Sequence, residues 1–438
     1  MVSQKPKNFN LGILHRTKVT ASSGLFLLMT FAQDIGLGKE LERLFSHLKL
    51  RERGYRISTK MLSFIEMIIK GGDRLSDIDV LRADPGLLDI SGMKSFPRPN
   101  TLGDLARRFS RRDVHRLAEV VMRMACRAIG AKGFKEVVLD LDSSLIASDV
   151  QIAKKSYEGY RGFNPLLGML RAGGMSWAAF SLFRPGNAAP QANNLSLLRK
   201  ISRFVKRYAF GVRLKVRIDS AGYNHRIMRY CDRQGHDFVI AGEQFECILD
   251  IIKGIEDWEP LRGGKAGEEV GEGVHFVGPE KEGAAYRFVT VRRRKDQGAL
   301  FPEFEYTYRL YFTNTDWETH RVVHFYRKRG DAENTIKELK EGFALDHILS
   351  EDFLASAVFF QLQLLAYNLV QYFKSTHLER PWWTMRIKRL RYRLINIAGV
   401  IIRHSRKRVL RLSVHYKYLK TFRAVFHSLH IRRIELRI

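Results

Sequence analysis

Residues 136–142 read Glu136-Val137-Val138-Leu139-Asp140-Leu141-Asp142, a short run rich in β-branched and apolar residues. Such a run is typical of a strand in the middle of a sheet. Because side chains alternate along a strand, Asp140 and Asp142 lie on the same face of it. Acids are rarely buried on such a strand without a partner. The stretch therefore predicts an α/β fold whose central strand carries a polar site.

A second acid follows another predicted strand. Residues 213–218 have the pattern of a strand, and Asp219 comes directly after them. The next three residues, Ser220-Ala221-Gly222, turn the chain into a helix that we expect over 224–234. Ligands of open α/β sheets collect at this position, beside the carboxyl end of a strand. The alternative for Asp219 is an ordinary turn or helix-capping role.

A third acid belongs to a helix expected over 326–340, which reads Tyr-Arg-Lys-Arg-Gly-Asp-Ala-Glu-Asn-Thr-Ile-Lys-Glu-Leu-Lys. At about 100° per residue, four side chains project within an arc of roughly 60°, and Lys337 joins them. These four are Tyr326, Arg329, Glu333 and Lys340. Such a stripe would suit a surface that holds a metal ion and a phosphate backbone together. The alternative is a solvated face with ion pairs between residues four apart.

Asp142, Asp219 and Glu333 are the acids that we expect to share one catalytic site, with Asp140 as a further metal ligand or as the alternative to Asp142. Phosphodiester chemistry with two divalent cations needs several carboxylates, which hold the ions about 4 Å apart. Hard oxygen ligands select Mg²⁺, with Mn²⁺ as the possible substitute, over zinc. Each acid taken singly could be structural, but their combination with the helix stripe favours a catalytic metal site.

The cysteines point to a compartment and exclude two kinds of site. The sequence contains 3 cysteines, which are too few and too dispersed for a disulfide framework or a zinc site. A reducing cytoplasm is therefore the expected location.

The charge of the chain indicates nucleic acid as its partner. The 438 residues include 75 Lys and Arg against 46 Asp and Glu, a net charge of +29. Residues 381–438 hold sixteen Lys or Arg and one acid, which is about half of that excess. Such an excess is costly in a compact protein unless a polyanion neutralises part of it. We expect the basic tail to make salt-sensitive contacts with a nucleic-acid backbone.

The first 130 residues have a helical pattern, and the helix expected over 102–129 carries clustered arginines. A compact, basic, helical domain of this kind is typical of a DNA-binding module. A packing domain with a solvated basic face is equally compatible with the pattern. The arginines that we expect to contact DNA are Arg107, Arg108, Arg111 and Arg112.

Changes of pattern divide the chain into five segments. These are a helical N-terminal domain (1–130), the first part of an α/β core (131–244), a β-rich insertion (245–305), the second part of the core (306–375) and a basic helical C-terminal region (376–438). A hairpin is expected between 286–292 and 306–312.

One apolar run needs a decision about membranes. Residues 353–373 carry no charge over 21 positions and are long enough to cross a bilayer. Three glutamines and an asparagine interrupt the run, and its leucine and aromatic positions suit a helix buried in protein. We therefore expect a core helix and no membrane contact.

Three stretches together resemble a known family. They are Val-Leu-Asp-Leu-Asp-Ser-Ser at 138–144, Arg-Ile-Asp-Ser-Ala-Gly-Tyr at 217–223 and Tyr-Arg-Lys-Arg-Gly-Asp-Ala-Glu at 326–333. With Lys340, the last is similar to the YREK signature of bacterial cut-and-paste insertion-sequence transposases of the DDE class. The closer resemblance is to the insertion-sequence group numbered thirteen-eighty, over roughly residues 15–415.

The resemblance implies an RNase H-like catalytic core that is interrupted by the insertion. It also implies that Asp142, Asp219 and Glu333 are the metal-binding triad. Asp142 is preferred to Asp140 because the two matching serines of the motif follow it directly.

Tyr326, Arg329 and Lys340 would then hold DNA phosphates near the scissile bond, with Lys337 beside them. The implied activity is binding of the terminal inverted repeats of a mobile element, hydrolysis of the end phosphodiesters and transfer of the freed 3′ ends to target DNA. The implied partners are double-stranded DNA and a second copy of the chain on paired ends, at the nucleoid of a bacterial cytoplasm. The alternatives are a related nuclease that cuts without joining, and a non-catalytic DNA-binding protein from a decayed element.

Overall fold

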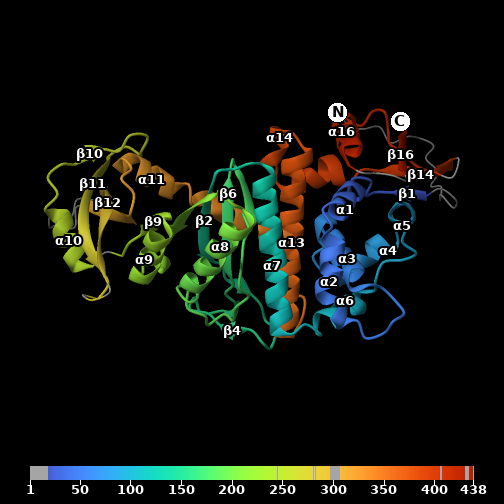
Figure 1. Cartoon of the computed structure of the whole chain (residues 1–438), viewed down its shortest axis with the longest axis horizontal. Helices are drawn as coiled ribbons and strands as arrows, with labels where there is room; N and C mark the ends of the chain where they lie inside the picture. Colours follow the sequence, from blue (N-terminus) through green and yellow to red (C-terminus); the bar gives the residue numbers. More distant parts are fainter. Residues whose placement is uncertain are drawn as a thin grey trace, which may run out of the picture.

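A mixed sheet of nine strands forms the centre of the fold in the computed structural model (Figure 1). The structure describes residues 18–243, 245–279, 281, 283–295, 306–404, 407–429 and 434–437. The strands of the sheet are β2 (Glu136–Ser143), β6 (Leu166–Ala172), β7 (Met175–Ala178), β8 (Arg213–Ile218), β9 (Asp237–Ala241), β10 (Glu259–Pro260), β11 (Glu268–Val277), β12 (Ala284–Arg294) and β13 (Tyr306–Thr313). They lie in the order β10-β11-β12-β13-β9-β8-β2-β6-β7. β2, β8 and β9 are parallel, whereas β6 and β7 are added antiparallel beside β2. The predicted α/β class with a mixed sheet is confirmed.

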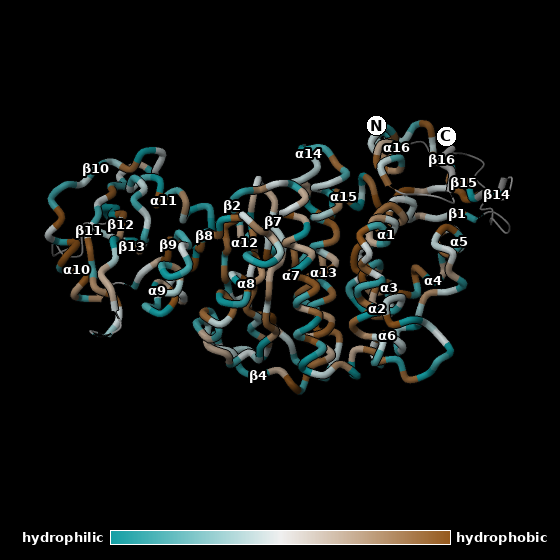
Figure 2. The backbone as a smooth tube through the Cα atoms, viewed as in Figure 1, coloured by the Kyte–Doolittle hydropathy of each residue, from teal (hydrophilic) through white to brown (hydrophobic). Residues whose placement is uncertain are grey.

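Long helices cover the sheet. They are α7 (Arg111–Ala131), α8 (Asn194–Tyr208), α9 (His225–Gln234), α12 (Gly330–Phe343) and α13 (Phe353–His377). α13 packs against both α7 and β7, and Figure 2 shows hydrophobic residues along α7 and α13. Asn368 fixes this packing, because its Nδ2 donates to the carbonyls of Val121 and Ala178 and its Oδ1 accepts from the Ala178 N–H.

The apolar run at 353–373 forms most of α13. Among the described helices, α13 is long and apolar enough to cross a membrane, but 89% of its most apolar stretch is buried inside the protein. Its amide side chains have partners in the core: Gln361 donates to the carbonyl of Ser181, and Gln363 donates to that of Ala344. The prediction that this run forms a core helix is confirmed.

The insertion continues the central sheet instead of forming a separate one. β13 pairs antiparallel with β9, and β12 and β11 follow it as a meander. The pairing of β12 with β13 sets Arg292 opposite Tyr308, so the strands of the predicted hairpin lie together. The helices α10 (Glu246–Lys253) and α11 (Thr319–Arg327) pack against these strands. Residues 244, 280, 282 and 296–305 lie outside the described residues.

The N-terminal helices share one apolar core with α13. They are α1 (Leu25–Asp34), α2 (Leu37–Phe45), α3 (Ile57–Lys70), α4 (Ile78–Arg82), α5 (Pro85–Ser91) and α6 (Pro99–Ala106). The single helix predicted over 102–129 is wrong, because α6 ends at Ala106 and α7 begins at Arg111. Ser110 and Asp113 set this start: each side chain accepts from the backbone N–H of the other, which is a capping box. Residues 1–17 lie outside the described residues.

The C-terminal region is only partly helical, so the prediction of a helical tail is wrong. Its elements are α14 (Arg380–Trp383), α15 (Ile387–Leu390), a π-helical turn (Arg391–Ile395), β14 (Gly399–His404), β15 (Lys407–Arg411), α16 (Leu419–Ser428) and β16 (Ile434–Arg437). β14 pairs antiparallel with β1 (Lys18–Thr20), so both ends of the chain share a four-stranded sheet. Basic residues alternate here with apolar ones, and Ile401, Leu410 and Phe422 are buried in the N-terminal core. Residues 405, 406, 430–433 and 438 lie outside the described residues.

Candidate active site

Asp142 and Asp219 lie at the carboxyl ends of two adjacent parallel strands. Leu141 on β2 is in register with Ile218 on β8, and one of the acids follows each of them directly. Asp219 also accepts a hydrogen bond from the Ala221 N–H at 3.1 Å, at the start of a short 3-10 turn, which orients its carboxylate. The sheet therefore brings together two acids that are distant in sequence.

The guanidinium of Arg329 bridges all three predicted acids. Its Nη2 lies 3.0 Å from Asp142 Oδ1 and 2.9 Å from Asp219 Oδ2, and its Nη1 lies 3.6 Å from Glu333 Oε1. Because one nitrogen contacts both aspartates, the separation of their two oxygens is at most the sum of the first two distances. The side chain of Arg329 is 13% exposed, so this contact is largely shielded from water.

The continuous helix predicted over 326–340 is wrong. α11 ends just after Tyr326, α12 begins at Gly330, and Arg329 lies in the junction between them. The junction is a tight turn, because the N–H groups of Arg329 and Ala332 bond to carbonyls three residues back. Acids in the first turn of α12 suit the positive end of the new helix. Arg329 therefore reaches the two aspartates, while Glu333 lies at the rim with its side chain 68% exposed.

Asp140 is bound to a different partner. Arg217 on β8 donates from Nε to Asp140 Oδ1 at 2.6 Å and from Nη2 to Oδ2 at 2.9 Å. The two side chains are only 1% and 3% exposed. Arg217 also donates to the carbonyl of Phe325, near the end of α11, at 2.6 Å. Both oxygens of Asp140 are used in this buried pair, which gives Asp140 a structural contact, and its role as a metal ligand stays a prediction.

Two of the predicted phosphate-binding side chains lie near the acids. The ring centroid of Tyr326 is 4.5 Å from that of Tyr311, and burial raises the pKa of Tyr326 to about 12, which leaves it a neutral donor. Lys340 donates from Nζ to the carbonyl of Leu145, just beyond β2, at 2.9 Å. Lys337 differs from both, because its side chain is 60% exposed and pairs with Glu341 at 3.6 Å.

The predicted N-terminal arginines lie at the junction of α6 and α7. Arg107 pairs with Asp104 at 2.6 Å, and Arg108 is half-buried and donates to the carbonyl of Leu48 at 3.4 Å. Arg111 and Arg112 are exposed. Their contact with DNA stays a prediction.

The family of the chain follows from a comparison along nearly its whole length. The family profile described as Transposase DDE domain group 1 matches residues 15–434. The chain belongs to the DDE transposase family. Among solved structures, the cryo-EM structure of a piggyBac transposase synaptic complex with hairpin DNA is similar with a TM-score of 0.40 and 12% sequence identity, covering 85% of this chain and 79% of that chain. No curated protein matches the sequence.

The acids of this transposase fit a divalent cation. Within the described residues, no three Asp, Glu, His or Cys side chains are close enough together to hold a metal as they stand. Asp142 and Asp219 nevertheless meet at one nitrogen, and the exposed Glu333 contacts the same guanidinium. Burial raises the pKa of Asp142 to about 6; Asp219 and Glu333 add to the rise, and Arg329 opposes it. A cation would relieve this crowding of negative charge, and carboxylate oxygens suit Mg²⁺ or Mn²⁺.

Two side chains that sequence reasoning missed also lie beside the acids of the transposase. Tyr157 and Asn194 line, with Asp142 and Asp219, a cavity of about 120 Å³. Tyr157 lies in the turn between two strands of a small sheet, which consists of β3 (Ile146–Ala147), β4 (Lys154–Lys155) and β5 (Arg161–Phe163). A glycine such as Gly159 is typical of a turn, but no periodicity in the sequence could place that turn beside the acids.

Proposed function

We propose that this transposase binds the terminal inverted repeats of a mobile element, hydrolyses the end phosphodiesters and joins the freed 3′ ends to target DNA. The observation that carries the proposal is the contact of Asp142, Asp219 and Glu333 with one guanidinium, beside the ends of two parallel strands. Phosphodiester transfer with divalent cations needs carboxylates from several elements at one point. Membership of the DDE transposase family supports the same chemistry.

The side chains around the acids have separate roles in this proposal. Asp142, Asp219 and Glu333 would hold Mg²⁺, or Mn²⁺ in its place, which supplies Lewis-acid stabilisation of charge at the scissile phosphate. Arg329 would exchange its contacts with the acids for contacts with a DNA phosphate, because a guanidinium binds both kinds of oxygen. The neutral hydroxyl of Tyr326 would donate to a phosphate oxygen, and Lys340, with Lys337 nearby, would add positive charge.

We also infer that β7-β6-β2-β8-β9 forms an RNase H-like core. The support is the central position of β2, with antiparallel strands on one side and parallel strands on the other. The net charge of +29 supports double-stranded DNA as the partner. Two copies of the chain on paired ends, working at the nucleoid of a bacterial cytoplasm, complete the proposal that the family resemblance suggests.

An assay with labelled end DNA, Mg²⁺ and the full-length protein tests the proposal. Three variants should keep DNA binding, and their rate of strand cleavage should fall by about 100-fold or more, because several kcal/mol of charge stabilisation are lost. They are Asp142→Asn, Asp219→Asn and Glu333→Gln. Asp331→Asn is the matched control: Asp331 lies in the same helical turn as Glu333, is 60% exposed and pairs with Arg171 at 3.6 Å. We expect this control to cleave at the rate of the unmodified protein.

The products of the same assay separate transposition from the other two activities. Strand-transfer products support transposition. Cleavage without joining would indicate a nuclease, and binding with neither product would indicate a DNA-binding protein. Unimpaired cleavage by Glu333→Gln would remove Glu333 from the site.

A further inference from the structure

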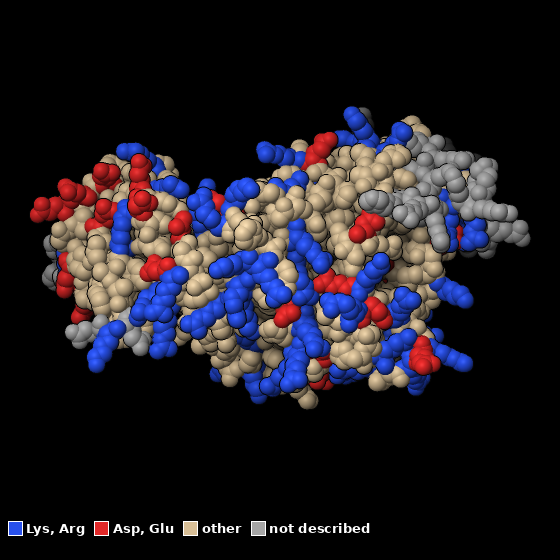
Figure 3. All heavy atoms as spheres, in the orientation of Figure 1, with Lys and Arg blue, Asp and Glu red and all other residues tan. Residues whose placement is uncertain are grey.

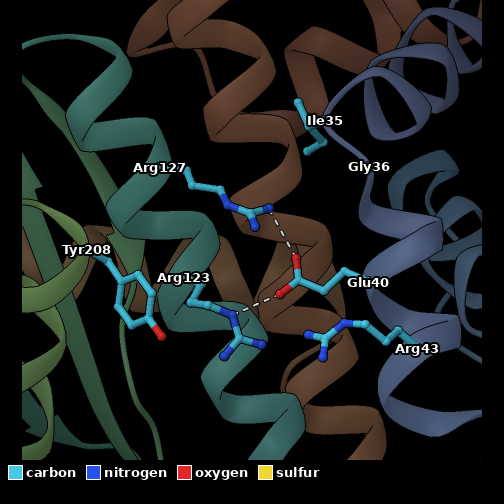
Figure 4. Close-up of a pocket in the computed structure, with 7 residues that line it drawn as sticks. All are labelled: Ile35, Gly36, Glu40, Arg43, Arg123, Arg127 and Tyr208. Carbon is cyan, nitrogen blue, oxygen red and sulfur yellow. Dashed lines mark hydrogen bonds and ion pairs between the residues drawn. The ribbon is translucent and has the colours of Figure 1, made fainter.

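An arginine-lined cavity lies where the N-terminal helices meet the core. Its volume is about 290 Å³. The residues that line it are Ile35, Gly36, Glu40, Arg43, Arg123, Arg127 and Tyr208. Figure 4 shows that three elements contribute the polar side chains: α2 supplies Glu40 and Arg43, α7 supplies Arg123 and Arg127, and Tyr208 comes from the end of α8. None of the residues assigned above to the active site belongs to this cavity.

The hydrogen bonds in the cavity leave cationic donors unused. Glu40 accepts from Arg123 Nε at 2.8 Å and from Arg127 Nη1 at 3.1 Å, and Arg123 Nη1 lies 3.4 Å from Glu119. Arg123 Nη2 is buried and has no hydrogen-bond partner in the described part of the chain. A buried guanidinium N–H without an acceptor costs free energy, so an added anionic oxygen would stabilise it.

The other arginines reinforce this imbalance of charge. The side chain of Arg43 is exposed and forms no hydrogen bond or ion pair within the described part of the chain. The side chain of Arg127 is 46% exposed, so it is available to a ligand in spite of its contact with Glu40. Three arginines and one glutamate line the cavity, which therefore has a net positive charge.

The cavity ends a basic stripe on α7. Arg112, Arg116, Arg123 and Arg127 follow one another at helical intervals and project within an arc of roughly 60°. Exposed basic residues of α8 are Arg199, Arg203, Lys206 and Arg207. Figure 3 shows Lys and Arg gathered over α7 and α8. At about 1.5 Å per residue, the stripe on α7 rises about 22 Å, the length of six or seven base pairs at about 3.4 Å each.

We propose that the cavity binds one backbone phosphate of duplex DNA that lies along α7 and α8. A phosphate oxygen would accept from Arg123 Nη2, while Arg43 and Arg127 would donate from the two walls of the cavity. Glu40 would keep the guanidinium of Arg123 in its orientation. The regular stripe beside the cavity favours a phosphate of a polyanion over a small free anion. This inference rests on the proposed function, since it takes DNA as the partner.

The test is the salt dependence of DNA binding by the full-length protein. Arg43→Gln and Arg127→Gln are combined in one variant, and duplex DNA binding is measured by fluorescence anisotropy between 50 and 200 mM salt. Loss of one phosphate contact should make the plot of log affinity against log salt concentration less steep by about 1. The loss of affinity between the two salt concentrations should then be about 3.5-fold smaller for the variant than for the unmodified protein. Because both side chains are exposed, the melting temperature of the variant should stay unchanged.

A control variant loses the same charge elsewhere. Lys253→Gln with Lys265→Gln removes two exposed lysines from the insertion, and its slope should equal that of the unmodified protein. A folded cavity variant with an unchanged slope would overturn this inference alone, whereas failure of the unmodified protein to bind or cut DNA would overturn the proposed function itself.

Discussion

Arg329 contacts Asp142, Asp219 and Glu333 through its two terminal nitrogens, so one positive charge now holds the acids that divalent cations would share. Under the proposed function, the guanidinium and the cations would compete for the same carboxylate oxygens. The site would then have an arginine-bound form and a cation-bound form, in which Arg329 turns to the DNA. The stability of the protein without DNA should therefore respond to cations through this one residue.

Replacing Arg329 tests that competition. Arg329→Gln should lower the free energy of unfolding by about 1–3 kcal/mol without divalent cations, because two partly buried carboxylates lose their partner. Millimolar Mn²⁺ should then raise the melting temperature of the variant more than that of the unmodified protein. Differential scanning calorimetry with and without Mn²⁺ measures both effects. Equal responses to Mn²⁺ would contradict competition between Arg329 and the cations.

Asp140 and Asp142 should respond differently to loss of charge. Asp140→Asn leaves Arg217 buried without a carboxylate, which should lower the free energy of unfolding by about 3–5 kcal/mol. Asp142→Asn should abolish cleavage and leave a cooperatively folded protein. Urea denaturation checks the first expectation, and the cleavage assay checks the second. A stable Asp140→Asn protein that cannot cut DNA would indicate that Asp140 acts in the metal site.

The aspartates of the candidate site were predictable from the sequence, but their partners were not. Period-two alternation placed Asp140 and Asp142 on one face, as the strand shows. Nothing in the pattern indicated which of the two aspartates Arg217 would bind, because that choice depends on the register of β2 with β8. A register between strands is set by tertiary packing, which a local pattern does not contain.

At the scale of elements, α3 contains a buried acid. Glu66 is 6% exposed in the N-terminal core, and its Oε2 has no hydrogen-bond partner among the described residues. Burial raises the pKa of Glu66 to about 8. Because the folded protein then binds a proton that the unfolded chain has lost, the stability that this group contributes falls as pH rises from about 4.5 to about 8.

Glu66→Gln should remove this pH dependence. The unmodified protein should lose on the order of 1.4 kcal/mol per pH unit between about pH 5 and pH 8 through this group, and the variant should be the more stable of the two at pH 8. Urea denaturation at several pH values measures the difference. Glu52→Gln, at an exposed position, is the control. Parallel pH profiles for the Glu66→Gln and unmodified proteins would contradict the account of this buried acid.

Elements were predicted better than their ends. The strand at 136–142 and the core helix at 353–373 correspond to β2 and α13, since long apolar runs identify buried elements. The helices expected over 102–129 and 326–340 are each interrupted. The first break is made by a capping box at Ser110, whose side-chain hydrogen bonds outweigh helical periodicity. At the second break the backbone N–H groups of Arg329 and Ala332 bond to carbonyls three residues back, which tightens the chain into a turn.

At the scale of the whole molecule, the two ends of the chain meet. β1 and β14 pair although hundreds of residues separate them. The guanidinium of Arg391 in the π-helical turn donates to the carbonyls of Ile68 and Ile69 at the end of α3. The count of charges in residues 381–438 predicted a basic region in contact with nucleic acid, but such a count does not show which apolar residues between the charges are buried. The tail is therefore part of the N-terminal core.

Deletion of the residues after Pro381 should consequently unfold the N-terminal core. Leu394, Ile395 and Phe422 are at most 1% exposed, and their loss would uncover apolar surface on α1 and α3. The truncated chain should show no cooperative thermal transition by circular dichroism and should aggregate on size-exclusion chromatography. A soluble truncated protein that melts cooperatively would show that the tail is dispensable for folding.

Anomalous diffraction from crystals of the full-length protein soaked in Mn²⁺ tests the central claim most directly. The claim predicts an anomalous peak within about 2.2 Å of a carboxylate oxygen of both Asp142 and Asp219, with Arg329 displaced from them. Absence of a peak there, from crystals of a protein that cuts DNA in the same Mn²⁺ buffer, would contradict the claim.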